Sequence, residues 1–474
     1  MSVLSTTPLW TALEARAATC GQLAGGDEWV VSGLSIDTRT LRSGEMFVAL
    51  KDARDGHDFI QAAREAGATA ALASDATAAA NGPALMVEDT LTGLSALAAA
   101  ARDRNFGKLI AVTGSAGKTS TKEMLRAALA PSGKVHAAQK SFNNHIGVPL
   151  TLAALPANAR FGVFEIGMNH AGEITPLVGL VRPHVAIITT IAAAHLEFFD
   201  SVDGIAAAKA EILTGLRPGG VAVLPADSDY YDFLCDEAGR NGVTTIIPFG
   251  ESARAQWGVR LLDYDPDGAG PAKLTVSVEG EKKIFTLDSP GRHQASNACA
   301  VIAAALASGA TVDSVIAGLE RFAAGSGRGA THVMTIRGAT VHIIDESYNA
   351  NPASMAAALK VLGTTRQGTE GRRIAVLGEM RELGKDSDVF HRQLTTPIAE
   401  AGVDMVYTAG PGMVPLRDAL GSGVHRAHAE QALDLIEPLL ADLQDGDIVL
   451  FKGSNASRVG PLLDAFLSNA TMGE

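Results

Sequence analysis

The sequence has few cysteines and no excess of positive charge. Its three cysteines, Cys20, Cys235 and Cys299, lie far apart and lack the paired spacing of a zinc site or a disulfide framework. This cysteine usage is typical of a reduced, cytoplasmic compartment. The formal net charge of −13 argues against nucleic-acid binding, which requires clustered lysine and arginine. An anionic small molecule would need cations placed locally around it.

Long apolar runs are also absent. The apolar stretch at 298–307 is too short to cross a bilayer, and the N-terminus lacks the basic and then apolar pattern of a signal peptide. We therefore expect no membrane partner. Hydrophobic residues make up 47% of the chain and charged residues 19%, which is enough apolar material for several cores. A length of 474 residues favours roughly three domains.

Strand and helix patterns divide the chain into three predicted α/β domains, at 1–90, 91–325 and 326–474. The first mixes short strands, such as EMFVAL, with an amphipathic helix. The second has buried strands with crossover helices, which predicts a mostly parallel sheet, and residues 274–287 predict an antiparallel hairpin added to it. The glycine-rich stretch at 323–330 is the predicted linker. The third predicts a Rossmann-like, doubly wound unit. Its predicted strands are at 341–344, 373–377, 404–409 and 447–451.

A glycine-rich turn is the most informative segment. Residues 113–119 read TGSAGKT and lie between a predicted buried strand, KLIAVT, and a helix that begins near Lys118. Glycines let backbone N–H groups converge on phosphate oxygens, Lys118 can reach the outer phosphates, and Thr119 can ligate magnesium. Val112 stands where the common phosphate loop has its first glycine, so this is a shorter G-x-x-G-K-T variant. The alternative is a glycine turn that only caps a helix.

Two polar residues follow predicted strands of the same sheet. Glu165 ends the apolar strand FGVFE, and His195 follows HVAIITTI after a short alanine-rich loop. Ligands of open parallel sheets bind at such carboxyl ends, so both are candidates for a metal site beside the phosphates. The alternatives are a glutamate that faces water and a solvated histidine.

Lys209 lies within the apolar stripe of a predicted helix, DSVDGIAAAKAEILTGL. The helix alone favours a lysine that extends its ammonium group to water. In the other reading, burial lowers the pKa of the amine, which then adds carbon dioxide to form a carbamate, a carboxylate-like metal ligand.

Four further residues have both a structural and a functional interpretation. Asn297 begins a long apolar helix, where it is either a surface residue or a ligand contact, and Arg328 lies in the glycine-rich linker as either a solvated or a ligand-binding cation. Asp345 ends a strand of the third region, which suits a ribose hydroxyl or a metal. Asn351 precedes Pro352 and so predicts a helix N-cap.

Taken together, these segments resemble the Mur ligase family over nearly the whole chain. The pairing of NNHIGVPLTL with SYNANPASM resembles the member of the family that adds a dipeptide. The segments that carry the resemblance are SIDTRTLRSGEMFVALKDARDGHDF, TGSAGKTSTKEML, SFNNHIGVPLTL, FEIGMNHAGEI, AAAHLEFFDS with IAAAKAEIL, GRHQASNA, IDESYNANPASMAAAL, AVLGEMRELG and FKGSN.

The resemblance implies roles for residues at matching positions. The implied catalytic residues are Lys118, Glu165, His195 and Lys209, the last as a carbamylated lysine. The implied Mg²⁺ site contains Thr119, Glu165, His195 and Lys209. The implied ATP contacts are Gly114, Ser115, Ala116, Gly117, Lys118, Thr119, Ser120, Asn297, Arg328 and Asp345. The implied substrate contacts are Asp37, Thr38, Arg39, Asn143, Asn144, Tyr348, Asn349 and Asn351.

The implied activity is ATP-dependent ligation of D-alanyl-D-alanine to UDP-MurNAc-tripeptide through an acyl phosphate, by a cytoplasmic monomer. The three domains would bind the uridine nucleotide substrate, ATP and the amine, in that order. The rivals are a sister amino-acid-adding or folylpolyglutamate synthase-like ligase, and a nucleotide-dependent switch that lacks ligation. Two positions depart from the family pattern. Gln294 replaces asparagine in GRHN, and Asn455 replaces an arginine expected to bind the dipeptide carboxylate, for which Arg458 is the candidate substitute.

Overall fold

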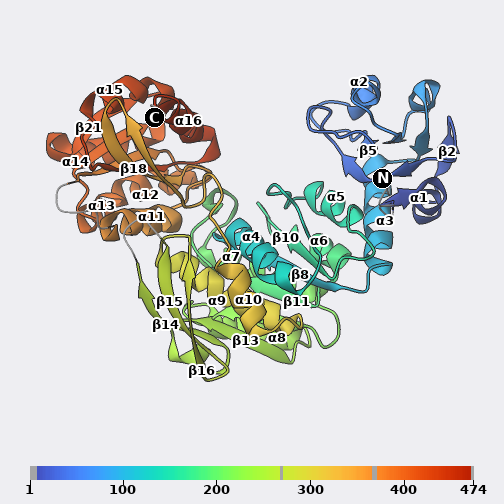
Figure 1. The fold of residues 1–474 in the computed structure, drawn as a ribbon, viewed down its shortest axis with the longest axis horizontal. Helices are drawn as coiled ribbons and strands as arrows, with labels where there is room; N and C mark the ends of the chain where they lie inside the picture. The colour runs from blue at the N-terminus through green and yellow to red at the C-terminus, as the bar shows by residue number, and fades with distance from the viewer. Residues whose placement is uncertain (1–7, 267–270, 366–370, 471–474) are drawn as a thin grey trace, which may run out of the picture.

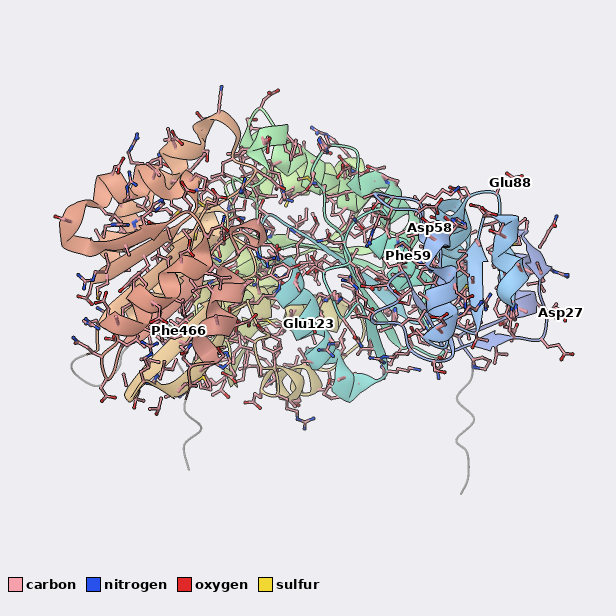
Figure 2. The ribbon with its side chains drawn as sticks, turned by 90° about the horizontal axis from the view of Figure 1, so that it is seen from above. Asp27, Asp58, Phe59, Glu88, Glu123 and Phe466 are labelled. Carbon is pink, nitrogen blue, oxygen red and sulfur yellow. The ribbon has the colours of Figure 1, made fainter. Side chains whose placement is uncertain are left out.

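The computed structural model describes residues 8–266, 271–365 and 371–470. Within them lie sheets of five, nine and six strands, and a two-stranded pairing of β1 with β3. The nine-stranded sheet lies between the other two (Figure 1). In the perpendicular view of Figure 2, Asp27 and Glu88 lie at one end of the molecule, Phe466 at the other and Glu123 between them. The predicted α/β class with a mostly parallel central sheet is confirmed.

The five-stranded sheet is formed by the first part of the chain, in the order β2-β7-β6-β5-β4. The predicted amphipathic helix begins with a 3-10 turn, η1, where the Asp55 carboxylate accepts a hydrogen bond from the His57 N–H. The elements are β1 (Trp10–Thr11), α1 (Ala12–Thr19), β2 (Gln22–Ala24), β3 (Val30–Val31), β4 (Gly33–Ser35), β5 (Glu45–Val48), η1 (Gly56–Phe59), α2 (Ile60–Glu65), β6 (Ala70–Ala73), η2 (Ala76–Asn81), β7 (Ala84–Met86) and α3 (Thr90–Asp103).

The nine-stranded sheet has the order β16-β15-β14-β13-β12-β11-β8-β10-β9. Its strands run parallel from β9 to β14, and β15 and β16 form the predicted antiparallel hairpin. Its strands are β8 (Lys108–Thr113), β9 (Val135–Ala137), β10 (Phe161–Glu165), β11 (Val185–Ile188), β12 (Val221–Pro225), β13 (Thr245–Gly250), β14 (Val259–Asp265), β15 (Ala272–Val278) and β16 (Glu281–Leu287).

Both faces of this sheet are covered by apolar side chains. Along β8, Leu109 and Ala111 pack into one core and Ile110 and Val112 into another, so the strand is apolar at successive positions. The helices are α4 (Lys118–Leu129), η3 (Ala130–Ser132), α5 (Gly147–Ala153), α6 (Ile174–Val181), η4 (Leu196–Phe198), α7 (Val202–Ala210), η5 (Glu211–Gly215), α8 (Tyr231–Arg240), η6 (Ala253–Trp257), α9 (Arg292–Ala307) and α10 (Val312–Leu319).

The six-stranded sheet is doubly wound, with the order β17-β18-β22-β19-β20-β21 and apolar cores on both faces. The four predicted strands are present. Its elements are β17 (Ala330–Ile336), β18 (Ala339–Glu346), α11 (Pro352–Thr364), β19 (Arg373–Gly378), η7 (Gly384–Asp386), α12 (Ser387–Gln393), α13 (Thr395–Glu400), β20 (Met405–Ala409), η8 (Pro411–Met413), α14 (Val414–Val424), β21 (His425–Ala429), η9 (Ala432–Leu435), α15 (Ile436–Asp442), β22 (Ile448–Lys452), η10 (Asn455–Ser457) and α16 (Val459–Leu467).

Two strands of this sheet, β17 and β21, escaped prediction. Both are edge strands, and β21 reads HRAHA, with no buried residue. Edge strands need little apolar sequence because one side is open. The three-domain division stays a prediction, although no strand ladder joins the three sheets within the described ranges.

No helix among the described residues combines the length and the apolar content needed to cross a bilayer.

Candidate functional site

The predicted phosphate loop joins β8 to α4. Gly114 and Gly117 have φ angles of +152° and +81°, which side chains rarely adopt. A Cβ on Gly114 would lie 1.9 Å from the Thr189 hydroxyl oxygen, and one on Gly117 would lie 2.7 Å from Asn297 Oδ1. The loop therefore requires both glycines. Residues 115–120, from the loop and the first turn of α4, line a cavity of about 680 Å³.

Lys118 and Thr119 lie on the first turn of α4. Lys118 Nζ donates to the Gly114 carbonyl at 2.6 Å, so the ammonium group lies against the loop. Burial lowers the pKa of Lys118, against the opposing effect of the Glu165 carboxylate. The Thr119 hydroxyl donates to Glu165 Oε2 at 2.7 Å. The loop and the carboxylate predicted to lie beside it are thus in direct contact.

Glu165 is buried at the carboxyl end of β10, with 3% of its surface exposed. β10 lies between β8 and β9, so the alternative of an edge-strand glutamate that faces water is wrong. Its second oxygen, Oε1, accepts a hydrogen bond from Asn143 Nδ2 at 2.8 Å. Asn143 therefore reaches the same cavity, whereas Asn144 is exposed and accepts a hydrogen bond from the N–H of Gly147, the first residue of α5.

Lys209 is 1% exposed, so its ammonium group does not extend to water. Its side-chain amine forms no hydrogen bond or ion pair with any described residue. Burial, and next the charge of Lys118, hold the pKa of Lys209 well below its ordinary value. An unpaired buried amine of this kind is stable only in its neutral form.

His195 lines the cavity, and its ring contacts a distant part of the chain. Nδ1 lies against Glu382 Oε2 in the loop between β19 and η7. His195 also has a left-handed backbone, with a φ angle of 60°.

The cavity is closed on one side by Arg328 of the glycine-rich linker and by residues that follow β18. Arg328 Nη2 donates to the Ser141 hydroxyl at 3.0 Å, and its guanidinium carbon lies 3.9 Å from the centre of the Tyr348 ring. Asn351 caps α11, as predicted, and its Nδ2 also donates to the Ser115 carbonyl at 3.2 Å. Tyr348, Asn349 and Asn351 all line the cavity.

Asn297 and the unusual Gln294 are paired. Both are buried on α9 and line the cavity, and Asn297 Nδ2 donates to Gln294 Oε1 at 3.2 Å. Gln294 therefore occupies the place of the family's asparagine, and Asn297 keeps a hydrogen-bond acceptor.

Asp345 is buried, and it does not line the cavity. Its carboxylate accepts hydrogen bonds from the N–H groups of Gly327 and Ser347 and from the hydroxyls of Ser326 and Ser347. This residue holds the linker against β18. A nucleotide contact by Asp345 stays a prediction.

The segment Asp37–Arg39 lies outside the cavity lining. Asp37 and the exposed Arg39 form a two-bond ion pair, with Arg39 Nη2 at 2.7 Å from Asp37 Oδ2. Hydrogen bonds from Arg39 lower the pKa of Asp37 to about 2. Thr38 between them is half-buried. Asn455 and Arg458 are exposed and also lie outside the cavity lining, so the structure brings neither to the site.

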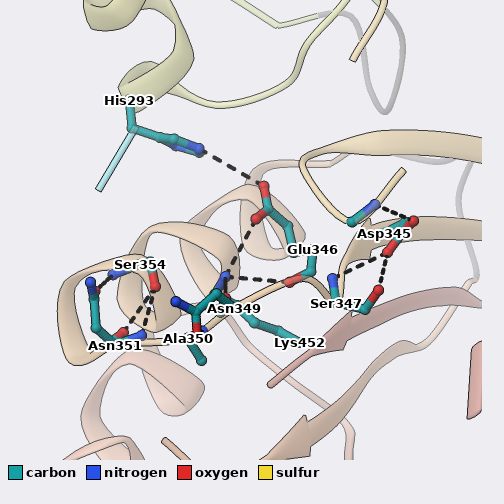
Figure 3. Close-up of polar contacts among 10 residues, drawn as sticks. His293, Asp345, Glu346, Ser347, Asn349, Ala350, Asn351, Ser354 and Lys452 are labelled. Atoms are coloured by element: carbon teal, nitrogen blue, oxygen red, sulfur yellow. Dashed lines mark hydrogen bonds and ion pairs between the residues drawn. The ribbon is translucent and has the colours of Figure 1, made fainter. Parts of the chain in front are cut away.

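A group of titratable residues at the cavity escaped the sequence analysis (Figure 3). Lys452 is 1% exposed; its Nζ donates to the Asn349 carbonyl at 3.0 Å and lies 3.4 Å from Glu346 Oε2. His293 Nε2 lies 4.0 Å from the other oxygen of Glu346. Glu346 and Lys452 are paired in register at the carboxyl ends of β18 and β22. That position was a usable signal, because ligands of such sheets bind there.

Comparison with known proteins agrees with this geometry. Three family models match: the Mur ligase family, catalytic domain, at residues 30–128; the Mur ligase middle domain at 112–305; and the Mur ligase, glutamate ligase domain at 327–455. The UDP-N-acetylmuramoyl-tripeptide–D-alanyl-D-alanine ligase of Escherichia coli K12 is 35% identical over 453 residues, which are 95% of this chain and 97% of the relative.

Solved structures give the same result. A crystal structure of MurF from Acinetobacter baumannii matches with a TM-score of 0.81 and 32% identity, covering 98% of this chain and 99% of the other. MurF ligase from Thermotoga maritima in complex with ADP matches with a TM-score of 0.76 and 27% identity, covering 92% and 97%. The chain therefore belongs to the Mur ligase family.

Proposed function

We propose that this enzyme uses ATP to join D-alanyl-D-alanine to UDP-MurNAc-tripeptide, the last cytoplasmic step in building the peptidoglycan pentapeptide precursor. The observation that carries the proposal is the convergence of the phosphate loop, Glu165 and Arg328 on one cavity. Relatives named for this activity align with nearly the full length of the chain.

The chemistry has two steps. A carboxylate oxygen of the tripeptide forms a bond to the γ-phosphorus of ATP while the bond to the β-phosphate oxygen breaks, which gives an acyl phosphate and ADP. The dipeptide nitrogen then bonds to the acyl carbon, phosphate leaves and the nitrogen loses a proton. Phosphoryl transfer needs mainly positioning and charge neutralisation. Lys118, Arg328 and the N–H groups at the start of α4 would supply both.

Each substrate would be bound by a different part of the chain. Asp37, Thr38 and Arg39 would bind the uridine nucleotide, and Asn143 and Asn144 the muramoyl peptide. Tyr348, Asn349 and Asn351 would face the amine. ATP would lie between, in contact with residues 114–120, Asn297, Arg328 and Asp345. We place the enzyme in the cytoplasm as a monomer, in line with the free state of its cysteines.

The donor atoms present fit Mg²⁺. The Thr119 hydroxyl and the Glu165 carboxylate are oxygen donors in contact, next to the phosphate loop. In the described part of the chain, no three histidine, cysteine or acidic side chains converge as a metal site. Mg²⁺ suits such a place because it takes one or two protein oxygens and fills its shell with phosphate oxygens and water. When bound, it would neutralise phosphate charge, with His195 and Lys209 as further members of the site.

Lys209 is proposed to carry a carbamate. Its neutral nitrogen would form a bond to the carbon of carbon dioxide and release one proton, which places a negative charge at the end of the side chain. The support is that Lys209 is buried, that its amine has no partner among the described residues, and that burial and the charge of Lys118 both lower its pKa. A carbamate would attract both that charge and a divalent cation.

Phosphate release should depend on the acceptor amine. With UDP-MurNAc-tripeptide and ATP, D-alanyl-D-alanine is expected to raise phosphate release far above the rate without an amine. Single amino acids, such as lysine, diaminopimelate and glutamate, should have no effect. Stimulation by one of these instead would indicate a sister ligase, and equal hydrolysis with and without an amine would indicate a nucleotide switch.

Replacing Arg328 by lysine is expected to lower kcat about 10–100-fold, because a charged hydrogen bond contributes about 1.5–3 kcal/mol. Lysine keeps the charge but loses the planar group that stacks on Tyr348 and bonds Ser141. The KM for UDP-MurNAc-tripeptide should change little. Steady-state ADP release measures both, with Arg337→Lys, at an exposed surface ion pair, as the control. Equal kcat values in the two variants would contradict this role.

A further inference from the structure

The contact between His195 and Glu382 joins two parts of the chain that are 187 residues apart. His195 belongs to the central sheet and lines the cavity, whereas Glu382 lies in the loop that follows β19 of the six-stranded sheet. The same loop is also held by its backbone, because the Glu197 N–H donates to the Glu382 carbonyl at 3.0 Å. A side-chain contact and a backbone hydrogen bond therefore both hold the Glu382 loop against the His195 segment.

The backbone at the contact is unusual on both sides. His195 and Glu382 have φ angles of 60° and 63°, in the left-handed region that non-glycine residues seldom occupy. Such conformations persist only where the surroundings hold them, and they concentrate at functional sites. Gly384 is also left-handed, and a Cβ there would lie 3.3 Å from Glu197 Cα, so the two loops meet closely.

The chemistry of the pair fixes the proton on the imidazole. A glutamate carboxylate is ionised near neutral pH and can only accept a hydrogen bond, and Glu382 Oε2 lies against His195 Nδ1. Nδ1 must then carry the hydrogen, and in the neutral ring Nε2 is left with a free lone pair. No described residue bonds Nε2. A histidine that ligates a metal is commonly oriented in this way by a carboxylate on its other nitrogen.

We infer that Glu382 is a positioning residue, which holds His195 in the tautomer that presents Nε2 to the cavity. This inference rests on the proposed function. Because Glu382 comes from the six-stranded sheet, His195 is oriented only while that sheet is docked against the central one. Docking of the six-stranded sheet therefore brings Arg328 to the site and also sets the tautomer of His195, which belongs to the central sheet.

The test compares Glu382→Ala and Glu382→Gln with Asp386→Asn. Asp386 is the last residue of η7, shortly after Glu382; it is exposed and makes no side-chain hydrogen bond, so its variant removes an equal charge without the contact. Glu382→Ala should weaken Mn²⁺ binding in the presence of ADP about 10–100-fold, measured by electron paramagnetic resonance. It should lower kcat on the same scale and leave the KM for UDP-MurNAc-tripeptide unchanged. Glu382→Gln should recover part of both losses, since its amide oxygen still accepts from Nδ1.

Nitrogen NMR of the imidazole gives a readout independent of ligation. The His195 signals, identified by their loss in His195→Gln, should show the Nδ1–H tautomer in the parent enzyme and in Asp386→Asn, and a shift toward Nε2–H in Glu382→Ala. An unchanged tautomer together with unchanged Mn²⁺ binding in Glu382→Ala would overturn the inference. Failure of the parent enzyme to ligate D-alanyl-D-alanine would instead overturn the proposed function, and the tautomer measurement would still stand.

Discussion

Replacing Lys209 by alanine is expected to reduce ligation by about 10³-fold or more, the scale on which loss of one charge-stabilising group acts on phosphoryl transfer. Lys209 is 1% exposed and its amine is unpaired among the described residues, so it contributes no contact as a cation. Its use would come from the carbamate, which supplies negative charge beside Lys118. Ligation is measured as product formed from UDP-MurNAc-tripeptide and D-alanyl-D-alanine.

Chemical rescue separates the carbamate from a packing role. A small carboxylate, such as formate or acetate, should fit the space left by the Lys209→Ala side chain and restore part of the rate. Lys209→Arg should be inactive and should not be rescued, because a guanidinium neither forms a stable carbamate nor leaves space. Labelled bicarbonate should give a carbamate NMR signal in the parent enzyme alone. Full activity of Lys209→Ala would remove the carbamate proposal.

Lys118→Met is expected to lower kcat by at least about 10³-fold. Methionine keeps most of the length of the side chain but removes the charge next to the phosphate loop. The charge is most effective in the transition state, where negative charge spreads over the transferred phosphoryl group, so kcat should fall more than ATP binding. Single-turnover ADP formation and equilibrium ATP binding measure the two effects separately.

The control is Lys108→Met, at the exposed first residue of β8, on the strand that leads into the same loop. This variant should keep the parent kcat. A Lys118→Met enzyme with parent kcat and weaker ATP binding would show that the lysine only holds the nucleotide.

Local sequence signals predicted the parts of the site that depend on neighbouring residues. The phosphate loop lies between a buried strand and a helix that begins at Lys118, as its glycines and the flanking sequence predicted, and Asn351 forms the predicted N-cap. Strands with continuous apolar sequence, such as β8 and β10, were predicted because both of their faces are buried.

Contacts between distant segments gave no local signal. On the helix alone, Lys209 favoured extension to water, and only the packing around α7 shows that water is out of reach. Glu382 had no distinctive pattern, because its role depends on a loop nearly two hundred residues away. Lys452 ends a predicted strand, but its place at the cavity follows from the strand order, which sequence periodicity does not encode.

The hydrogen bonds between Asp345 and the linker limit the residues at which the six-stranded sheet can rotate relative to the nine-stranded sheet. Ser326 and Gly327 are bonded to that carboxylate and so travel with the six-stranded sheet, whereas the Ala324 N–H is bonded to the Asp288 carbonyl of the central region. Gly325 lies between these two anchors: its carbonyl accepts a hydrogen bond from the Arg328 N–H, and a Cβ added to it would meet no atom within 4 Å. Rotation between the sheets is therefore expected at the Ala324–Gly325 junction. Arg328 would thus move with the six-stranded sheet as a rigid body, because it lies only three residues after the hinge residue Gly325.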